Sequence, residues 1–178
     1  MLELNLPEAI ITERLKLQRL RYEDAEEIYY TYASKPEATR FVAWPTHVTI
    51  ADTRTYLGYA IPGWRQGVDF TFSIREINSN RMIGSCGILN DQGRLQYGYI
   101  LGPVHWGKGF ATEAGLAIMS ELQKHSGIYR ICAFADVDNV ASIRVLQKIG
   151  MKEEATLEKW FRFVNQGNQP KDCVLYKL

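Results

Sequence analysis

A strand, a glycine-rich turn and the start of a helix follow one another in residues 95–114, and this succession constrains the chain most. Gly107 and Gly109 carry no side chain, so the turn can present backbone N–H groups to a ligand. The helix that follows leaves its first N–H groups unpaired, and its dipole directs positive charge the same way. The stretch therefore predicts a phosphate or pyrophosphate site, although a tight strand-to-helix turn alone would also use two glycines.

The same stretch nearly forms a P-loop, the nucleotide-binding loop that requires Ser or Thr directly after its lysine to hold magnesium. Gly102, Gly107 and Lys108 have the spacing of that motif. Gly109 stands where the hydroxyl is needed, and Thr112 comes three residues later. A nucleotide-binding protein therefore stays open as the weaker alternative.

Composition sets the class of protein. A chain of 178 residues is long enough for one domain with a full core, so we expect a single domain over residues 1–178. The net charge of +1 does not favour nucleic-acid binding. Three scattered cysteines without a CxxC or histidine cluster favour reduced thiols, a cytoplasmic location and no metal site. No apolar run is long enough for a membrane span, and the start is not a secretory signal.

The first third of the chain predicts one strand and two helices. Alternation at Leu15 and Leu17 indicates a half-buried strand over residues 10–20. Residues 21–33 are helical in composition, and residues 49–66 predict a second helix that Pro62 and Gly63 end. Acidic side chains gather near the start of the first helix: Glu23, Asp24, Glu26 and Glu27. We expect them to form a solvated face, with attraction of a cationic substrate as the alternative.

Three strands then precede the central helix. Residues 68–74, 82–89 and 95–101 are separated by short turns, which predicts consecutive antiparallel pairing. The central helix covers residues 110–125, and Gly127 is its expected C-terminal cap. The apolar run 128–135 predicts a buried strand parallel to residues 95–101.

The last quarter of the chain predicts one more helix and a pair of strands. Asp138 or Asn139 has the side chain of an N-cap, and Gly150 closes the helix. The spacing predicts a buried face made of these residues: Ala141, Val145 and Ile149. Residues 155–163 and 173–178 predict the final strands, joined by a turn over residues 165–170.

Two motifs in this order resemble the GNAT superfamily of N-acetyltransferases. The segment 106–114 is similar to its acyl-coenzyme A motif, in which Gln or Arg, two residues, Gly, one residue, and Gly or Ala surround a pyrophosphate. Trp106 replaces the Gln or Arg, as is common in the branch of ribosomal-protein-alanine acetyltransferases. The segment 139–151 is similar to the second motif through Asn139, Ser142, Lys148 and Gly150. Residues 12–17 and 172–178 also resemble that branch.

The resemblance implies an α+β fold with a mostly antiparallel central sheet flanked by helices. Two parallel strands, residues 97–101 and 128–135, would splay into a V-shaped cleft that holds acetyl-coenzyme A. The cofactor-binding residues implied are Tyr99, Ile100, Leu101, Trp106, Gly107, Lys108, Gly109, Phe110, Ala111, Thr112, Asn139 and Ser142. The acceptor pocket would include Trp44, His47 and Trp64, although each also suits ordinary packing.

The implied reaction moves an acetyl group from acetyl-coenzyme A to a primary amine, with a protein N-terminal α-amine as the favoured acceptor. Alternatives are a small amine, such as a polyamine, an amino acid or an aminoglycoside, and a non-catalytic coenzyme A-binding module. The expected partners are acetyl-coenzyme A and the amine, without metal, nucleic acid or membrane, in a monomer or homodimer.

The chain departs from the family's catalytic pattern at two positions. Leu146 replaces the Tyr that many relatives use as thiolate donor, so Ser142 is the nearest replacement and Tyr176 a distant second. Gln96 replaces a Glu, and an amide cannot take the amine's proton, so the base is unassigned. Water-mediated candidates for the base are Glu13, Glu158 and His105. The backbone N–H of Leu101 is the expected oxyanion donor.

Overall fold

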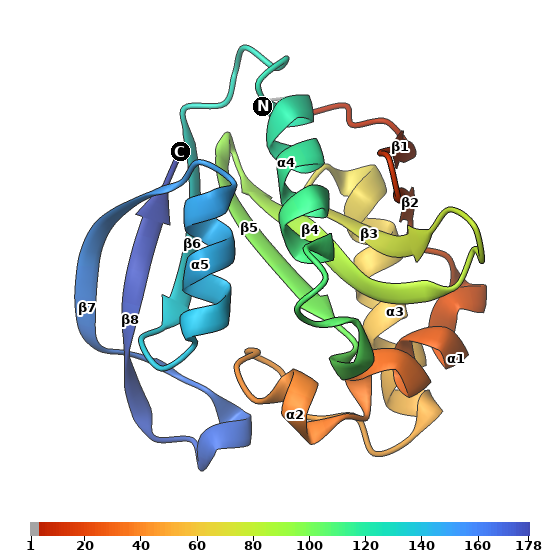
Figure 1. Cartoon of the computed structure of the whole chain (residues 1–178), viewed down its shortest axis with the longest axis horizontal. Helices are drawn as coiled ribbons and strands as arrows, with labels where there is room; N and C mark the ends of the chain where they lie inside the picture. Colours follow the sequence, from red (N-terminus) through yellow and green to blue (C-terminus); the bar gives the residue numbers. More distant parts are fainter. Residues whose placement is uncertain (1–3) are drawn as a thin grey trace.

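An eight-stranded sheet forms the centre of the computed structural model, which describes residues 4–178 (Figure 1). The strands are β1 (Ala9–Ile11), β2 (Leu15–Arg19), β3 (Asp69–Glu76), β4 (Met82–Asp91), β5 (Arg94–Leu101), β6 (Arg130–Asp136), β7 (Lys152–Arg162) and β8 (Pro170–Lys177). Their order across the sheet is β1-β2-β3-β4-β5-β6-β8-β7. Only the β5–β6 pair within residues 4–178 is parallel, which confirms the predicted mixed, mostly antiparallel sheet.

Helices cover both faces of the sheet. The α-helices are α1 (Ala25–Ile28), α2 (Pro36–Thr39), α3 (Ile50–Gln66), α4 (Phe110–Leu122) and α5 (Val140–Lys148). Short helical turns are η1 (Tyr22–Asp24), η2 (Tyr29–Ala33), η3 (Pro103–His105) and η4 (Val164–Gln166). Figure 1 shows α4 and α5 in front of the sheet and α3 behind it. No helix within the described part of the chain is both long and apolar enough to cross a membrane.

Strands β5 and β6 separate after a short paired segment. Only Arg94, Leu95 and Gln96 of β5 have partners on β6, and the last of these partners is Cys132. Beyond Gln96, β5 continues to pair with β4 and β6 with β8, so the two strands diverge (Figure 1). The facing backbone edges then lack a strand partner, which is the expected V-shaped cleft.

Alternation along the strands divides the core into two clusters. Tyr97 and Leu101 of β5 belong to the larger cluster, with Ile118 of α4. The smaller cluster joins Ile28 of α1 to Leu57 of α3 on the other face. The cleft between β5 and β6 therefore opens toward both faces of the sheet, one covered by α4 and α5 and the other by α1 and α3.

The predicted N-terminal strand is two strands, because the chain turns back at Thr12. The Thr12 N–H donates to the Leu15 carbonyl at 2.8 Å, and β1 pairs antiparallel with β2. The predicted helix over residues 21–33 is also broken into η1, α1 and the π-helical turn η2. Periodicity reveals neither the turn at Thr12 nor the change from α-helical to π-helical geometry.

Three predicted helix features are wrong. Helix α3 continues through Pro62 to Gln66 and ends at Gly67 with φ +72°. Pro62 removes a donor from the Gly58 carbonyl, but Gly58 is exposed, so water can bind there. Gly127 does not cap α4, which ends at Leu122 with Gln123 as its C-cap. The predicted buried face of α5 is wrong at Ala141, which is exposed, whereas Ile149 is buried as predicted and Leu146 is buried in addition.

Two of the four early acidic residues pair with one buried arginine. Arg75 of β3 donates to Asp24 at 2.8 Å and to Glu27 at 2.6 Å, and both Arg75 and Asp24 are less than 6% exposed. The cluster is therefore neither simply a solvated face nor a substrate attractor. Burial alone would raise the pKa of Glu27, but the hydrogen bonds from Arg75 and the Met82 N–H hold it below its ordinary value.

Arg75→Met leaves Asp24 buried without its close cation, since the exposed Arg21 is 4.0 Å away. We expect a loss of about 3–5 kcal/mol in the free energy of unfolding, as is usual when one partner of a buried pair is removed. Urea denaturation measures this loss. The control is Arg94→Met, which removes an exposed pair with Asp91 and should cost at most about 1 kcal/mol. Equal losses in the two variants would contradict the assignment.

Candidate active site

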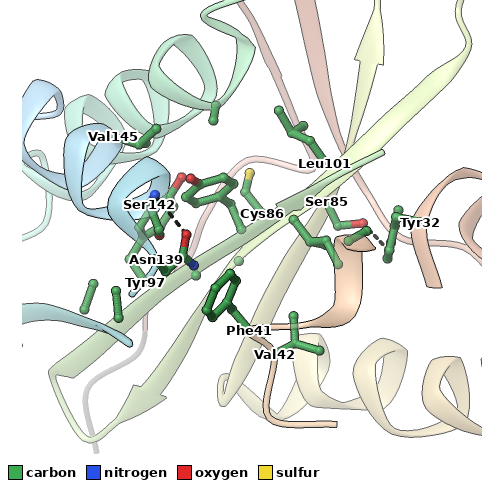
Figure 2. A pocket seen from close by; sticks show the side chains of 18 of the residues that line it. Tyr32, Phe41, Val42, Ser85, Cys86, Tyr97, Leu101, Asn139, Ser142 and Val145 are labelled. Carbon is green, nitrogen blue, oxygen red and sulfur yellow. Dashed lines mark hydrogen bonds between the residues drawn. The ribbon is translucent and has the colours of Figure 1, made fainter. Parts of the chain in front are cut away.

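A cavity of about 740 Å³ follows the cleft between β5 and β6. It reaches from the N-terminus of α4, past α5, to the loop after α2. Figure 2 shows residues from β4, β5, the second motif and the first third of the chain around this space. All the residues that the resemblance implies for the cofactor, except the exposed Lys108, line the cavity.

The glycine turn adopts a conformation suited to an anion. Gly107 and Gly109 have φ of +73° and +80°, in the left-handed region that favours glycine. An added Cβ at Gly107 would meet nothing within 4 Å, so the loop faces open space. The first bond of α4 joins the Glu113 N–H to the Gly109 carbonyl, and the N–H groups of residues 110–112 precede it. These donors and the helix dipole suit the pyrophosphate expected at this position.

The β1–β2 turn holds this glycine loop in place. Thr12 Oγ1 donates to Glu113 Oε1 at 2.6 Å, and Arg14 Nε donates to Glu113 Oε2 at 2.7 Å. Arg14 also donates to the Lys108 carbonyl at 3.0 Å and lies 4.6 Å from the centre of the Phe110 ring. Burial alone would raise the pKa of Glu113, but the hydrogen bonds from Thr12 and Arg14 lower it. Glu113 therefore stays ionised as an anchor for the loop.

Along the open edge of β5, successive residues direct their backbone groups alternately toward β4 and toward the cleft. The Gly102 N–H donates to the Ile83 carbonyl on β4 at 2.9 Å. Because backbone groups alternate in direction along a strand, the Ile100 backbone also faces β4, while the N–H groups of Tyr99 and Leu101 face the cleft. The Leu101 carbonyl accepts from Trp106 Nε1 at 3.0 Å.

This alternation corrects one predicted contact and supports two others. Ile100 lines the cavity with its side chain, but its backbone is paired with β4 and is not available to a ligand. Within residues 4–178 the N–H groups of Tyr99 and Leu101 have no partner on the cleft side, as a backbone oxyanion donor requires.

The second motif starts α5 beside the same cavity. Asn139 caps the helix by accepting from the Ser142 N–H at 3.2 Å (Figure 2). The Ser142 side chain interacts with the Tyr99 phenol: burial raises the pKa of Tyr99, and this interaction opposes the rise. Tyr176, the second candidate donor, is 1% exposed and accepts from Gln147 Nε2 outside the cavity lining.

The acceptor side includes two of the three predicted aromatic residues. Trp44 and His47 line the cavity with ring centres 5.0 Å apart, and His47 Nδ1 is 2.8 Å from Thr53 Oγ1. Burial lowers the pKa of His47, which favours the neutral ring. Trp64 lies outside the lining: it packs edge-on against Phe70 and Phe72, so its predicted role in the pocket is wrong.

The predicted proton acceptors are only partly placed in the cavity. Glu13 and Glu158 are exposed and do not line it. His105 does, with its Nδ1 buried and unpaired within residues 4–178, and burial lowers its pKa. Gln96 also lines the cavity.

Sequence reasoning missed polar residues from the sheet and from the last loop. The hydroxyls of Tyr32 and Ser85 are 2.6 Å apart on the cavity wall (Figure 2). Thr71 Oγ1 donates to Asp69 Oδ1 at 2.6 Å, and both line the cavity. Asn165 holds the loop that contains Trp44 and Thr46: it accepts from the Thr46 N–H and donates to the Trp44 carbonyl. Alternation along β3 predicts that residues 69 and 71 lie on the same face of the sheet. It does not predict which face borders the cavity.

Residues 14–152 match the family of acetyltransferase (GNAT) domains. The chain belongs to the GNAT family. The N-acetyltransferase p20 of Bacillus licheniformis is 31% identical over 86% of this chain and 87% of its own length. The N-acetyltransferase YoaA of Bacillus subtilis (strain 168) is 27% identical over 94% of each chain. This GNAT protein is therefore an acyltransferase, as predicted.

Solved structures agree with this GNAT fold. A GNAT acetyltransferase from Bacillus anthracis has a TM-score of 0.84 at 24% identity, over 96% of this chain and 97% of its own. The microcin C7 self-immunity acetyltransferase MccE, solved with acetyl-CoA and AMP, reaches 0.87 at 21% identity over 97% of each chain. RimL, the ribosomal L7/L12 acetyltransferase, solved with coenzyme A, reaches 0.86 at 18% identity, over 95% of this chain and 96% of its own.

Arg14→Gln removes the guanidinium that joins the β1–β2 turn to the glycine loop. We expect amide exchange in residues 107–112 to accelerate about five-fold, because loss of a multiply hydrogen-bonded, half-exposed pair costs about 1 kcal/mol locally. Hydrogen-exchange mass spectrometry measures the rate. Arg19→Gln is the control, since Arg19 also pairs with a carboxylate and lies over an aromatic ring, but away from the loop. Equal acceleration there would contradict a specific brace.

Proposed function

We propose that the protein transfers an acetyl group from acetyl-CoA to a primary amine, and that its acceptor is a protein N-terminal α-amine. The observation that carries the proposal is the junction of an open strand edge with a left-handed glycine turn in one cavity. A strand edge suits an extended chain with peptide-like amides, and a helix N-terminus suits a diphosphate. Coenzyme A has both parts joined end to end.

The residues of the cavity fit this ligand. The N–H groups of Tyr99 and Leu101 would bind the pantetheine arm, and residues 107–112 would bind the diphosphate. Acetyl-CoA supplies an activated acetyl group as a thioester. MccE and RimL, which share the fold, were solved with acetyl-CoA and with coenzyme A, and this supports the assignment.

The chain's own groups can serve the transfer in three ways. The Leu101 N–H points into the cleft and can stabilise negative charge on a carbonyl oxygen. The Ser142 hydroxyl, at the start of α5, can donate to a departing thiolate. The apolar side chains of Phe41, Val42 and Trp44 form an acceptor wall that limits the access of water.

The choice of an N-terminal amine draws on the neighbours as well as on the cavity. RimL acts on a ribosomal protein, and a ribosomal-protein-S5-alanine acetyltransferase from Vibrio fischeri shares the fold at a TM-score of 0.82. A nucleotide-binding P-loop is disfavoured, because residues 103–105 form a helical turn and Gly109 supplies no metal ligand.

Ligand stabilisation and acetyl transfer test the proposal together. Coenzyme A without magnesium should raise the melting temperature, by about 2.7 kcal/mol of stability at a hundredfold excess over Kd. Peptides starting with Ala, Ser or Thr should release free thiol from acetyl-CoA, while the same peptides with a blocked N-terminus should not.

Three results would contradict parts of this proposal. Stabilisation by magnesium-ATP alone would favour the nucleotide site. Transfer only to polyamines, amino acids or aminoglycosides would replace the proposed acceptor. Coenzyme A binding without transfer to any amine would indicate a non-catalytic module.

Ser142→Ala tests the thiolate donor. We expect turnover to fall ~10-fold with little change in coenzyme A affinity, because a hydroxyl that meets developing charge acts mainly in the transition state, and water can partly replace it. The Asn139 cap uses the Ser142 backbone N–H, so the helix start is kept. Steady-state kinetics and calorimetry on one variant separate the two effects.

Ser120→Ala is the matched control, since Ser120 is exposed on α4 outside the cavity lining. Equal loss of turnover and affinity in Ser142→Ala, or loss of neither, would refute the donor role. A tyrosine at position 146 is not a useful rescue, because Leu146 is 2% exposed in the core and overpacking costs about 1–3 kcal/mol.

A further inference from the structure

A carboxylate outside both sequence motifs lies on the acceptor side of the cavity floor. Asp69 of β3 pairs with Leu89 of β4, which pairs with Gln96 of β5. Residues paired in one row of a sheet project to the same face. Asp69 therefore shares a face with Gln96, two strands away, or roughly 10 Å at the usual strand spacing. Position 96 is where the resemblance implies a glutamate.

The next row leaves space between this carboxylate and the cleft. Thr71 pairs with Gly87, and Gly87 pairs with Gly98. An added Cβ at Gly98 would meet nothing within 4 Å, while one at Gly87 would lie 2.7 Å from Thr71 Oγ1. The floor from Thr71 to β5 thus carries no side chain, and Asp69, Thr71 and both glycines line the one cavity.

The surroundings of Asp69 leave one oxygen free. Thr71 Oγ1 donates to Oδ1 at 2.6 Å, and this is the one hydrogen bond of the Asp69 carboxylate within residues 4–178. From α3, Gly63 packs against its Cβ, and the buried phenol of Tyr56 has a raised pKa and so stays neutral. From β4, only Gly87 and Leu89 face it.

The other charged residues of the cavity lining lie on different elements. Glu37 is exposed on α2, while Arg144 and Lys148 are on α5. Asp69 is thus the half-buried anion on the acceptor side. Among the described residues that line the cavity, the only other carboxylate is Glu37.

We propose that Asp69 binds the ammonium form of the acceptor and takes its proton, so that the base stands on β3 and not at position 96. This inference rests on the proposed acetyl transfer to a primary amine. The ion pair would form at the free Oδ2, directly or through one water. It commits the site to a cationic primary amine, since an amide or an alcohol offers no charge to pair.

The proton balance of the reaction is complete with this residue. One N–H bond of the ammonium breaks, its proton moves to Asp69, and the electron pair stays on nitrogen. That pair forms the new C–N bond while the C–S bond breaks. Of the three ammonium protons, one passes through Asp69 to water, one ends on sulfur and one stays in the amide.

Asp69→Asn tests the base without changing its shape. We expect kcat/KM for an unblocked Ala-peptide to fall at least 100-fold, the usual lower bound for loss of a general base. Coenzyme A affinity, measured by calorimetry, should stay within two-fold of wild type. Asp91→Asn is the matched control, because Asp91 is an exposed aspartate at the end of β4 outside the cavity lining.

Thr71→Val supplies a signature that a structural role would not give. Burial raises the pKa of Asp69, and the Thr71 hydrogen bond opposes the rise, so removing the hydroxyl should raise that pKa further. A base must be ionised, so the acidic limb of the rate profile should move to higher pH. Carbon NMR titration of the Asp69 carboxyl in the ligand-free protein should move in the same direction.

Five outcomes would overturn the proposal. Asp69→Asn with wild-type kcat/KM would exclude the base while leaving acetyl transfer intact. Parallel losses of coenzyme A affinity and kcat/KM would indicate a structural role. If the acidic limb of the pH–rate profile does not move in Thr71→Val, the base lies elsewhere. The same conclusion follows if His105→Asn loses that limb while Asp69→Asn keeps it. Wild-type protein that acetylates no amine would refute the proposed function and this inference with it.

Discussion

The separation of β5 from β6 after Gln96 is the constraint on which the rest of the structure depends. A parallel pair that stayed together would use the cleft-facing groups of Tyr99 and Leu101 in the sheet, and no open edge would remain for a ligand. Close contact between α4 and α5 joins the two halves of the sheet near the segment where β5 pairs with β6. An added Cβ at Gly115 of α4 would lie 2.8 Å from Ile149 and 3.1 Å from the Tyr97 hydroxyl. Gly115 thus allows the helices to approach closely where the strands begin to separate.

Because side chains and backbone groups alternate in direction along β5, neighbouring residues of this strand have different roles. Tyr97, Tyr99 and Leu101 point their side chains to the α4 side, and Tyr99 and Leu101 turn backbone donors to the cleft. Gln96, Gly98 and Ile100 face the acceptor side. One strand would therefore separate the proposed cofactor site from the proposed acceptor site, and both open into the same cavity. A one-residue slip in the β4–β5 register would exchange these tasks, which explains why the fold needs an uninterrupted β4–β5 ladder.

Sequence patterns predicted what depends on local chemistry. The two left-handed glycines, the Asn139 cap and the strands from residue 68 to residue 101 follow from turn, cap and period-two signals. The errors lie where distant contacts decide. Thr12 at the β1–β2 turn also donates to Glu113 of α4, and α3 continues through Pro62 where Gly58 is exposed. Trp64 packs edge-to-face with Phe70 and Phe72 and does not line the pocket. Asp69 was missed because its place near the cleft depends on register across three strands.

The directions of the carboxyl pKa shifts separate structural carboxylates from the proposed base. Glu27 and Glu113 have lowered pKa values, so the folded state favours their ionised forms. Their contribution to stability is present above the ordinary carboxyl pKa and is lost as pH falls through the lowered values. Asp69 has the opposite shift: burial raises its pKa, so its contribution to stability is lost as pH rises through the raised value. Near neutral pH an ionised Asp69 therefore costs stability, whereas the two glutamates add it. A carboxylate that destabilises the fold in the state in which it can accept a proton is better explained by a role in the cavity than by a role in packing.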